Sequence, residues 1–589
     1  MNKPQTRALS AKRIAVAVAA VCATLSMPAS AGDDVKVLLD LMLKKGVITQ
    51  SDYDQFLKST SDSAEDKAFK EKRIEADVAK ASKFVLQHEK DGSVKPSGLG
   101  WVSADGKNEI NLTGRLHFDA RMSNNAWGKT TDRDSGSAAD RFSVRRARIG
   151  VNGVFNKDFT YEMVTNLTGT TTNTGATNST AVVDTAWVNY VISPENQWRF
   201  GRMKTPLAME TLTSSNNIDF MERSYLDQLA PGKQNGAMFH GEKDGIIYAF
   251  SGWQSGYDPI TSSNGLAPQF GGRVATNIAN LFGAAGINSV LHVGLAGMVG
   301  KQEVTPVTSS QKGSTYETKG AFLVFRDENQ GLSPIFRDRI YGSCPYGSPK
   351  AGGQNTTDCT TAGANAVPSG YSLPAQDAAQ VDKVMGAFEA AYATGPLKVQ
   401  YEYADAKLTA KSQAQNAAGS STWSTESSGH AKVQYISFMY NLTGEEWKDT
   451  YKSGLFGGIK PKSNFSVKDG TGTGAWQLGL RMSQYDATSF GTSTNGTLPA
   501  DEETTGSNGK HTCSGSGANN CYQLGGSPKG TTYTMGVNWI LNPNARVMLN
   551  YSHTQFDTSF YPIDNGTPSS RVKAADHSDM ISLRTQFNF

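Results

Sequence analysis

From about residue 108 onward, apolar and polar residues alternate with a period of two. In 110–122, for example, one parity is largely apolar and the other carries polar and charged residues. The alternation recurs in 159–167, 397–403, 476–483 and 533–539, with Arg or Lys on the polar parity and aromatic residues near the ends. One such stretch would suit the half-buried strand of a soluble sandwich. The number and the length of these alternating stretches instead favour a membrane-spanning barrel, with lipid outside and water inside.

Seventeen stretches are candidate strands, beginning near residues 109, 141, 158, 181, 196, 236, 245, 270, 290, 318, 382, 396, 430, 474, 530, 544 and 578. Bacterial single-chain barrels have even strand numbers, so at least one candidate is wrong or missing. The stretches near 270 and 318 are the weakest. The predicted fold class is all-β: a transmembrane antiparallel β-barrel of sixteen strands, with eighteen as the alternative. The polar stretches 327–380, 409–429 and 487–529 are expected to be extracellular loops.

The last strand, 581–589, alternates up to a terminal Phe589. An amphipathic strand that ends in an aromatic residue suits the membrane interface. It also resembles the C-terminal signature by which outer-membrane barrels are delivered for assembly.

The N-terminus has the three parts of a secretory signal peptide. Four basic residues precede the apolar run Ile14–Leu25, and Ala29-Ser30-Ala31 is a small-x-small cleavage site. The apolar run is too short for a membrane anchor, which is the alternative. Cleavage of residues 1–31 removes four of the basic residues, which changes the formal charge from +3 to −1. We therefore expect an outer-membrane location in a Gram-negative bacterium after cleavage, and no nucleic-acid partner.

Residues 32–99 are expected to be a periplasmic helical or coiled-coil segment that precedes the barrel at 100–589. A helix is predicted to stop at Gly46, and a second helix to be capped by Thr49. Residues 64–90 are charged, and their apolar residues are spaced 4, 3 and 4 apart, as in a short coiled-coil seam. A solvated helix is the alternative to an oligomerising stalk, and the segment could also contact the cell wall.

Hydropathy and motifs argue against two other classes of protein, a helical membrane protein and an enzyme. Apolar residues make up 38% of the chain, the mean hydropathy is −0.43, and no apolar run long enough for a membrane-spanning helix occurs outside the N-terminus. The eight His residues are scattered, and neither a His-Glu-x-x-His nor a Gly-x-Ser-x-Gly motif occurs. We therefore expect no enzyme, no cofactor and no metal site.

Four cysteines follow the signal peptide, as two close pairs in Gly- and Ser-rich stretches. In an oxidising compartment the simple interpretation is two loop disulfides, Cys344–Cys359 and Cys513–Cys521. A metal site is the weaker alternative, because no His or Cys lies beside them at ligand spacing.

The polar parity of the strands assigns a set of side chains to the lumen. Its basic members are Arg115, Arg121, Arg146, Arg148, Arg199, Lys398, Lys432, Arg481, Arg546 and Arg584. Its acidic members are Asp119, Glu162, Glu389 and Glu402. This excess of positive charge predicts a pore that concentrates anions, and arginine suits phosphate-like oxyanions. Alternatively, several of these residues pair with carboxylates. Arg141 and Arg145 lie off the lumen parity, where lipid phosphates are an alternative partner.

Residues 204–234 are rich in Pro and charged residues and are long for a strand connection. They are expected to fold into the channel as a constriction loop, with an ordinary external loop as the alternative. Its candidate residues are Arg202, Lys204, Glu210, Ser214, Ser215 and Arg223.

Several motifs occur in an order that resembles the phosphate-selective porins O and P of Gram-negative bacteria. They include Arg145-Arg146-Ala147-Arg148-Ile149-Gly150, Gly201-Arg202-Met203-Lys204-x-Pro206, Phe220-Met221-Glu222-Arg223-Ser224 and Leu583-Arg584-x-Gln586-x-x-Phe589. The resemblance covers most of 108–589. It implies a homotrimer of sixteen-stranded barrels, an inward-folded third loop and a ladder of basic residues that conducts anions. By the same resemblance Lys204 and Arg223 flank the constriction, and Ser214 and Ser215 donate hydrogen bonds.

The sequence thus predicts an outer-membrane porin for passive diffusion of small anions, with phosphate as the candidate and outer-membrane lipid around the barrel. A non-selective diffusion porin and a barrel with a structural or adhesive role are the alternatives.

Overall fold

The computed structural model describes the chain in stretches. These are residues 40–41, 43–46, 49–51, 53–54, 83–88, 94–123, 141–168, 170–171, 177–178, 182–254, 268–281, 289–303, 322–328, 334–339, 371–372, 380–416, 422–466, 468–489, 525–560 and 575–589. The chain divides into two compact units, Met1–Lys83 and Phe84–Phe589, and each is described by itself. The signal peptide 1–31, most of 64–90 and the four cysteines of the expected disulfides lie outside the described residues.

Gly46 separates two helical stretches in the first unit. Its φ of +68° lies in the left-handed region, which ends helices and suits glycine. The second stretch follows Thr49, whose carbonyl accepts a hydrogen bond of 3.0 Å from the N–H of Tyr53. The described residues on both sides of Gly46 are therefore helical.

The end of the expected helical segment is instead extended. Strand β1 (Lys83–His88) pairs with β2 (Val94–Val102), and β2 pairs with the first barrel strand from Leu99 to Val102. The prediction of a helix up to residue 90 is wrong here, because pairing with a neighbouring strand outweighs local helix propensity. Residues 84–99 consequently belong to the barrel unit, although the sequence suggested a boundary at residue 100.

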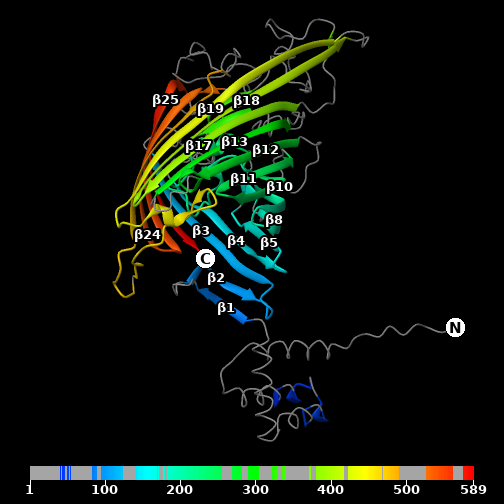
Figure 1. The fold of residues 1–589 in the computed structure, drawn as a ribbon, viewed down its shortest axis with the longest axis vertical. Helices are drawn as coiled ribbons and strands as arrows, with labels where there is room; N and C mark the ends of the chain where they lie inside the picture. The colour runs from blue at the N-terminus through cyan, green and yellow to red at the C-terminus, as the bar shows by residue number, and fades with distance from the viewer. Residues whose placement is uncertain are drawn as a thin grey trace, which may run out of the picture. The chain divides into compact units, whose positions relative to one another are not determined.

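Sixteen strands of the described chain form the barrel (Figure 1). They are β3 (Glu109–Ser123), β4 (Arg141–Phe155), β5 (Phe159–Asn166), β8 (Val182–Ser193), β9 (Asn196–Lys204), β10 (Lys233–Lys243), β11 (Ile246–Gln254), β12 (Pro268–Asn277), β13 (Ser289–Glu303), β17 (Gln380–Thr394), β18 (Leu397–Asn416), β19 (Thr422–Asn441), β22 (Ala475–Asp486), β24 (Lys529–Asn542), β25 (Ala545–Phe560) and β26 (Ala575–Asn588). Each pairs antiparallel with its neighbours in this order.

Pairing of β26 with β3 closes the barrel. The backbones of Gly114 and Phe589 also exchange hydrogen bonds of 2.9 and 3.1 Å. Closure leaves no free strand edge, which is the condition for a sheet to cross a hydrocarbon layer. The predicted sixteen-stranded barrel is therefore confirmed.

Smaller elements lie between the barrel strands. The short strands are β6 (Thr170–Thr171), β7 (Thr177–Asn178), β14 (Phe322–Arg326), β15 (Pro334–Arg339), β16 (Tyr371–Ser372), β20 (Tyr451–Lys452), β21 (Leu455–Phe456) and β23 (Gly525–Gly526). The helices are α5 (Met209–Leu212), α6 (Leu226–Leu229), α7 (Ile278–Leu281) and the 3-10 helix η3 (Trp447–Thr450). No helix in the described part of the chain is long and apolar enough to cross a membrane.

The seventeenth candidate strand, near 318, is not part of the barrel wall. The strand found there, β14, pairs with β15, and β15 pairs with β23 in a separate three-stranded sheet. The polar stretch 409–429 is also mostly strand rather than loop, because β18 and β19 remain paired as far as Gln415 and Thr422. The sequence pattern did not predict this extension of β18 and β19, because polar residues occupy both faces of the strands there.

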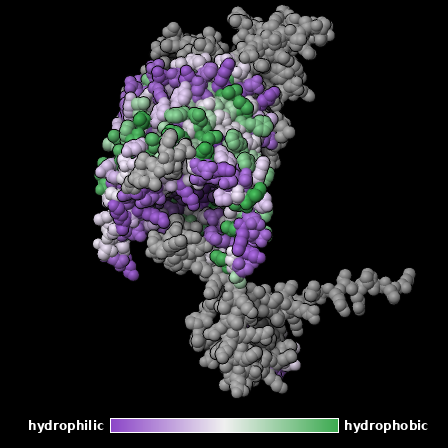
Figure 2. Space-filling view, in the orientation of Figure 1, coloured by the Kyte–Doolittle hydropathy of each residue, from purple (hydrophilic) through white to green (hydrophobic). Residues whose placement is uncertain are grey.

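The two faces of the barrel wall differ as the alternation predicts. On β22, Leu478 and Leu480 are 44% and 55% exposed on the outward face, whereas Arg481 and Ser483 are buried on the inward face. Figure 2 shows hydrophobic residues gathered across the middle of the outer wall on the visible side. Lipid outside and polar groups inside account for this distribution.

The outward apolar face gives a direct test of the membrane assignment. Leu480 lies in register between the outward-facing Phe438 and Met535. We expect Leu480→Arg to lower the free energy of unfolding by ~2–4 kcal/mol in lipid, because the guanidinium would enter hydrocarbon. Leu480→Met should change it by less than about 1.5 kcal/mol. Urea unfolding in lipid vesicles measures both, and an Arg variant as stable as the Met variant would contradict a lipid-facing Leu480.

Candidate functional site

The connection between β9 and β10, residues 204–234, runs inside the barrel and is called the inner loop below. Leu207, Tyr225 and Leu226 of this loop are almost fully buried. They share one apolar cluster with inward-facing small residues of β18 and β19, namely Ala404, Ala406 and Ala431. Small side chains on these strands leave room for the loop, which explains why it packs on this side of the lumen.

Glu222 of the inner loop is surrounded by four arginines of the barrel wall. Its carboxylate oxygens lie 2.6, 2.8, 2.9 and 3.8 Å from nitrogens of Arg121, Arg145, Arg584 and Arg146 respectively. Asp119 contacts Arg121 and Arg584 at 2.7 Å each. Burial opposes ionisation of Glu222, but the arginines outweigh it and hold the pKa of this carboxyl well below its usual range. An ionised carboxylate thus fixes the loop to β3, β4 and β26.

Arg145 belongs to this cluster because of a β-bulge. The pairing of β3 with β4 shifts between His117 and Phe118, and Arg145 is the residue left unpaired. Extra residues of this kind turn a side chain out of the normal alternation. The prediction from parity, which placed Arg145 off the lumen, is therefore wrong: its guanidinium donates to Glu222 over 2.8 and 3.1 Å.

A second set of ionic contacts holds the inner loop to β18 and β22. Arg481 lies 3.4 Å from Glu210 of the loop and 2.7 Å from Glu328, and Lys398 lies 2.8 Å from Asp219. Glu402 accepts hydrogen bonds of 2.8 Å from the backbone N–H groups of Met209 and Glu210. The loop is thereby anchored to β18 and β22 as well as to β3, β4 and β26.

Many of the basic residues predicted to line the pore therefore hold the inner loop. Arg121, Arg146, Lys398, Arg481 and Arg584 are buried and pair with carboxylates. Arg546 is also buried and donates to the carbonyl of Ile218 and to Gln586 over 3.1 and 3.0 Å. A buried, paired guanidinium contributes little free charge to the water in the lumen.

Six of the half-buried basic residues in the described chain form a second group. They are Arg115 on β3, Arg148 on β4, Arg199 and Lys204 on β9, Lys233 on β10 and Arg223 on the inner loop, and we call them the cationic strip. The half-buried acidic residues that interact with them are three: Glu162, Asp184 and Asp227. Six positive and three negative groups leave an excess of three positive charges within this set of residues.

Asp184 is the main carboxylate beside the strip. One of its oxygens lies 3.0 Å from Arg148, and the other contacts Lys233. Asp184 is the extra residue of a bulge in β8, where Val164 pairs with Thr185 and Thr165 pairs with Val183. The bulge brings a carboxylate between two cations and neutralises part of the strip.

Arg199 is held by aromatic rather than carboxylate contacts. Its guanidinium lies 4.1 Å from the ring centre of Trp187, and the Trp187 indole donates a 3.0 Å hydrogen bond to Glu162. Stacking on an aromatic face leaves the edges of a guanidinium available to anions.

The remaining constriction candidates serve mainly as loop contacts. Lys204 donates to the carbonyls of Leu212 and Thr213 over 2.9 and 2.8 Å, and Arg223 donates to those of Glu210 and Thr213 over 3.0 and 2.8 Å. Ser215 accepts a 2.8 Å hydrogen bond from Arg115, and Ser214 accepts one from the backbone of Asn216. In these contacts the serines are acceptors, whereas the sequence resemblance implied donors. Arg202 is half-buried within β9, so it belongs to the strand rather than to the loop.

Lys432 is not a lumen residue, which corrects the prediction. It is exposed on the outward face of β19, where it lies in register with Asp405 and Asp486. The inward parity of this strand holds Ala431, Val433 and Tyr435, which pack in the apolar cluster of the inner loop. The inward residues of β19 are apolar because they pack against the inner loop, so Lys432 lies on the outward face.

Two further segments enter the lumen. Phe325, Ile335 and Phe336 of the β14–β15–β23 sheet are buried in the same apolar cluster as the inner loop. The connection 442–474 between β19 and β22 contributes Trp447, Phe456 and Ile459 to a second apolar cluster. We call residues 442–474 the lower segment. Together with the inner loop, these segments narrow the lumen.

The alternation of apolar and polar residues along the strands could not identify several of the charged residues that lie inside the barrel. Asp184 becomes an inward residue only through a bulge, and Glu328 comes close to Arg481 only because its segment folds into the barrel. Asp219 and Glu222 were visible as charges among aromatic and apolar residues in 218–225, which is a signal for polar anchors on an inward-folded loop. Within the described residues, no group of three or more His, Cys, Asp or Glu residues is arranged to bind a metal ion.

Comparison with known proteins gives one family match. A family model described as phosphate-selective porin O and P matches residues 110–315 and 357–589. No curated protein sequence matches the chain.

Solved porin structures are similar at low sequence identity. OmpT of Vibrio cholerae is 9% identical, with a TM-score of 0.40 over 82% of this chain and 98% of its own. An anion-selective porin from Comamonas acidovorans is 10% identical, with a TM-score of 0.40 over 82% and 100%. The outer-membrane channel DcaP of Acinetobacter baumannii is 9% identical, with a TM-score of 0.39 over 82% and 97%.

The Glu222 cluster predicts how the inner loop responds to mutation and to pH. Glu222→Gln should lower the local unfolding free energy of the loop by ~3–5 kcal/mol, because it leaves four arginines without their shared carboxylate. Hydrogen exchange of the loop amides measures this change. Since the pKa of Glu222 is lowered in the folded state, its contribution should be complete above about pH 4.3 and shrink as the pH falls further.

Asp227→Asn is the matched control, because Asp227 pairs only loosely with Arg223, at 3.7 Å, and its side chain is 33% exposed. It should change loop stability by less than about 1 kcal/mol. Equal effects of the two substitutions would contradict a special role for Glu222.

Proposed function

Because the chain belongs to the phosphate-selective porin O and P family, we propose that its barrel is a water-filled channel that prefers small anions, with phosphate as the candidate solute. The family and the closed sixteen-stranded barrel make the chain an outer-membrane porin of Gram-negative type. The observation that supports the anion preference is the cationic strip, with six half-buried basic residues against three acidic ones.

The physical basis of the preference is the low dielectric of the surrounding wall. Charges in a narrow aqueous path between low-dielectric walls are weakly screened, so a small excess raises the local concentration of counter-ions. The buried arginines around Glu222 contribute less, because their charge is matched by Glu222 and Asp119. The half-buried groups therefore set the sign of the field that a passing ion meets.

Phosphate suits the chemistry of the strip. A guanidinium offers two parallel N–H groups that match two oxygens of an oxyanion, and a lysine ammonium adds a point charge. Arg115 and Arg148 are close enough to influence each other electrostatically, and both also interact with Asp184. An anion that passes Asp184 can exchange a protein carboxylate for its own oxygens as partners of these arginines.

We also infer the targeting and assembly that the sequence predicts. Residues 1–31 would be removed as a signal peptide, and the mature barrels would assemble as homotrimers in lipid. The segment after the signal peptide would lie in the periplasm, where it could contact the cell wall. Size measurement of the purified protein in detergent tests the trimer, and N-terminal sequencing tests the cleavage.

Reversal potentials test the anion preference. In a planar bilayer with a tenfold KCl gradient, we expect the wild-type channel to be anion-selective, and phosphate to reduce the chloride current. Arg148→Gln should lower the anion-to-cation permeability ratio about fivefold, for roughly 1 kcal/mol of lost attraction. Lys432→Gln, on the outward face, should leave the ratio unchanged.

The outcome also separates the alternatives. A cation-selective current would refute the proposal, equal permeabilities would favour a general diffusion pore, and an absence of open channels would favour a structural or adhesive role.

Asp184 gives a prediction of the opposite sign. Asp184→Asn should raise the anion-to-cation permeability ratio about fivefold, because Arg148 and Lys233 lose the carboxylate that neutralises them. The same bilayer measurement applies. Asp486→Asn is the matched control, since Asp486 lies on the outward face of β22 in register with Lys432 and Lys529. A ratio that falls or stays constant in Asp184→Asn would place the anion path away from this carboxylate.

A further inference from the structure

Trp187 projects into the lumen from β8, between Glu162 on β5 and Arg199 on β9. Each of these three residues is followed in the chain by a large apolar residue that is exposed on the outward face, namely Met163, Val188 and Phe200. Because side chains alternate along a strand, all three residues face inward. Trp187 pairs in register with Glu162 on one side and with Gly201, two residues from Arg199, on the other.

Trp187 uses the edge and the face of its indole for different partners. The Nε1–H group donates a hydrogen bond of 3.0 Å to a carboxylate oxygen of Glu162. The ring lies against Arg199, with 4.1 Å between the guanidinium carbon and the ring centre. One side chain therefore holds a carboxylate at its edge and a cation on its face.

Glu162 and Arg199 do not form an ion pair with each other. No described carboxylate lies within ion-pair distance of Arg199, and its Nε has no hydrogen-bond partner among the described residues. Glu162 still interacts with Arg199 electrostatically over a longer distance. Two strand spacings separate β5 from β9 by ~10 Å, which an extended glutamate and an extended arginine can bridge together. The indole between them accounts for their separation.

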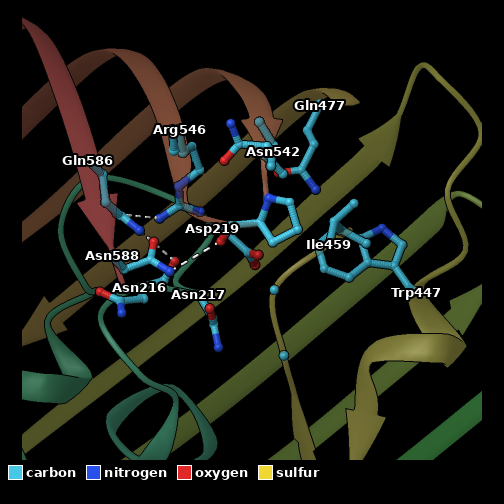
Figure 3. Close-up of a pocket in the computed structure, with 15 residues that line it drawn as sticks. Asn216, Asn217, Asp219, Trp447, Ile459, Gln477, Asn542, Arg546, Gln586 and Asn588 are labelled. Atoms are coloured by element: carbon cyan, nitrogen blue, oxygen red, sulfur yellow. Dashed lines mark hydrogen bonds between the residues drawn. The ribbon is translucent and has the colours of Figure 1, made fainter. Parts of the chain in front are cut away.

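Arg199 differs from the buried arginines of the barrel. Arg546 is 8% exposed, and Figure 3 shows it turned toward Gln586, to which it donates over 3.0 Å. A second nitrogen of Arg546 donates to the carbonyl of Ile218 over 3.1 Å. Arg199 is half-buried, and an aromatic face stabilises its charge without occupying its N–H groups. Its terminal N–H groups make no hydrogen bond within the described residues, so they are available to an anion.

The backbone of β9 brings Arg199 to the indole. Gly201 lies opposite Trp187 in register and has a φ of +118°, in the left-handed region. A Cβ atom at this position would lie 2.3 Å from the carbonyl oxygen of Ala186 and 3.0 Å from the Cα of Trp187. Only glycine therefore allows β9 to approach β8 so closely beside Trp187.

We propose that Trp187 is a positioning residue for anion selectivity, whose indole keeps Glu162 from neutralising Arg199. The N–H group gives the carboxylate a partner on β8, and the ring gives the guanidinium a partner that carries no negative charge. Arg199 then remains a cation that a passing anion can contact. The proposal rests on the anion preference proposed above and assigns a side chain that maintains it.

A double-mutant cycle on Trp187 and Glu162 tests this role in the planar bilayer. Trp187→Phe keeps a ring beside Arg199 but removes the N–H donor. Glu162 should then turn to Arg199 and lower the anion-to-cation permeability ratio about threefold. In a Glu162→Gln background the same substitution should leave the ratio unchanged, because no carboxylate remains to pair with Arg199. An unchanged ratio in Trp187→Phe alone, or an equal loss in both backgrounds, would overturn the proposal.

Glu162→Gln alone covers the case in which Trp187→Phe does not assemble. Since the indole already holds the carboxylate away from Arg199, this variant should raise the ratio by less than about twofold, compared with about fivefold for Asp184→Asn. A rise as large as that of Asp184→Asn would mean that Glu162 already neutralises Arg199, and would refute the role of Trp187.

Trp198→Phe is the matched control, because Trp198 lies next to Arg199 on β9 but is 42% exposed on the outward face. It should leave the permeability ratio unchanged, and a loss equal to that of Trp187→Phe would contradict the proposal. A cation-selective wild-type channel would refute the anion preference, whereas the coupling between Trp187 and Glu162 would still appear in the ratios. The two failures are therefore distinguishable.

Discussion

The ion cluster at Glu222 fixes the position of the inner loop inside the barrel. Four arginines project inward from β3, β4 and β26, and such charges inside a barrel need partners. The inner loop brings the carboxylate, and its apolar residues then pack on the small side chains of β18 and β19. The half-buried cations Arg148, Arg199 and Lys233 instead contact Asp184 and Trp187 of β8, which separates them from the arginines that hold the loop.

This division changes how the charge of a porin lumen should be counted. A count along the sequence treats every inward arginine alike, but Arg584 is fully buried between two carboxylates, whereas Arg148 is half-buried and shares one. Fully paired ions interact with one another at short range and have little field left at a distance. The sign of the electrostatic potential in the lumen therefore depends on the few charged side chains that share a carboxylate, stack on an aromatic ring or have no partner.

The fold was predictable to a large extent, because lipid imposes one rule on every strand. A side chain that meets hydrocarbon must be apolar, so the alternation marks strands directly, and sixteen of the seventeen candidates form the barrel. The false candidate near 318 has strand residues that pair in a small inner sheet. Alternation reports that a strand exists, but it carries no information about which sheet the strand joins.

The candidate site was less predictable, for two physical reasons. Bulges at Arg145 and Asp184 reverse the facing of single residues, and one extra residue in a strand leaves almost no trace in the sequence. The contents of the lumen also change what an inward face contains: β19 is apolar inside because the inner loop packs there, so its Lys432 was assigned to the wrong side. The rule that polar means inward holds only where water fills the barrel. Where loops pack inside the barrel, the inward residues follow the packing rules of a globular core, so the polar parity identifies only those inward residues that no loop covers.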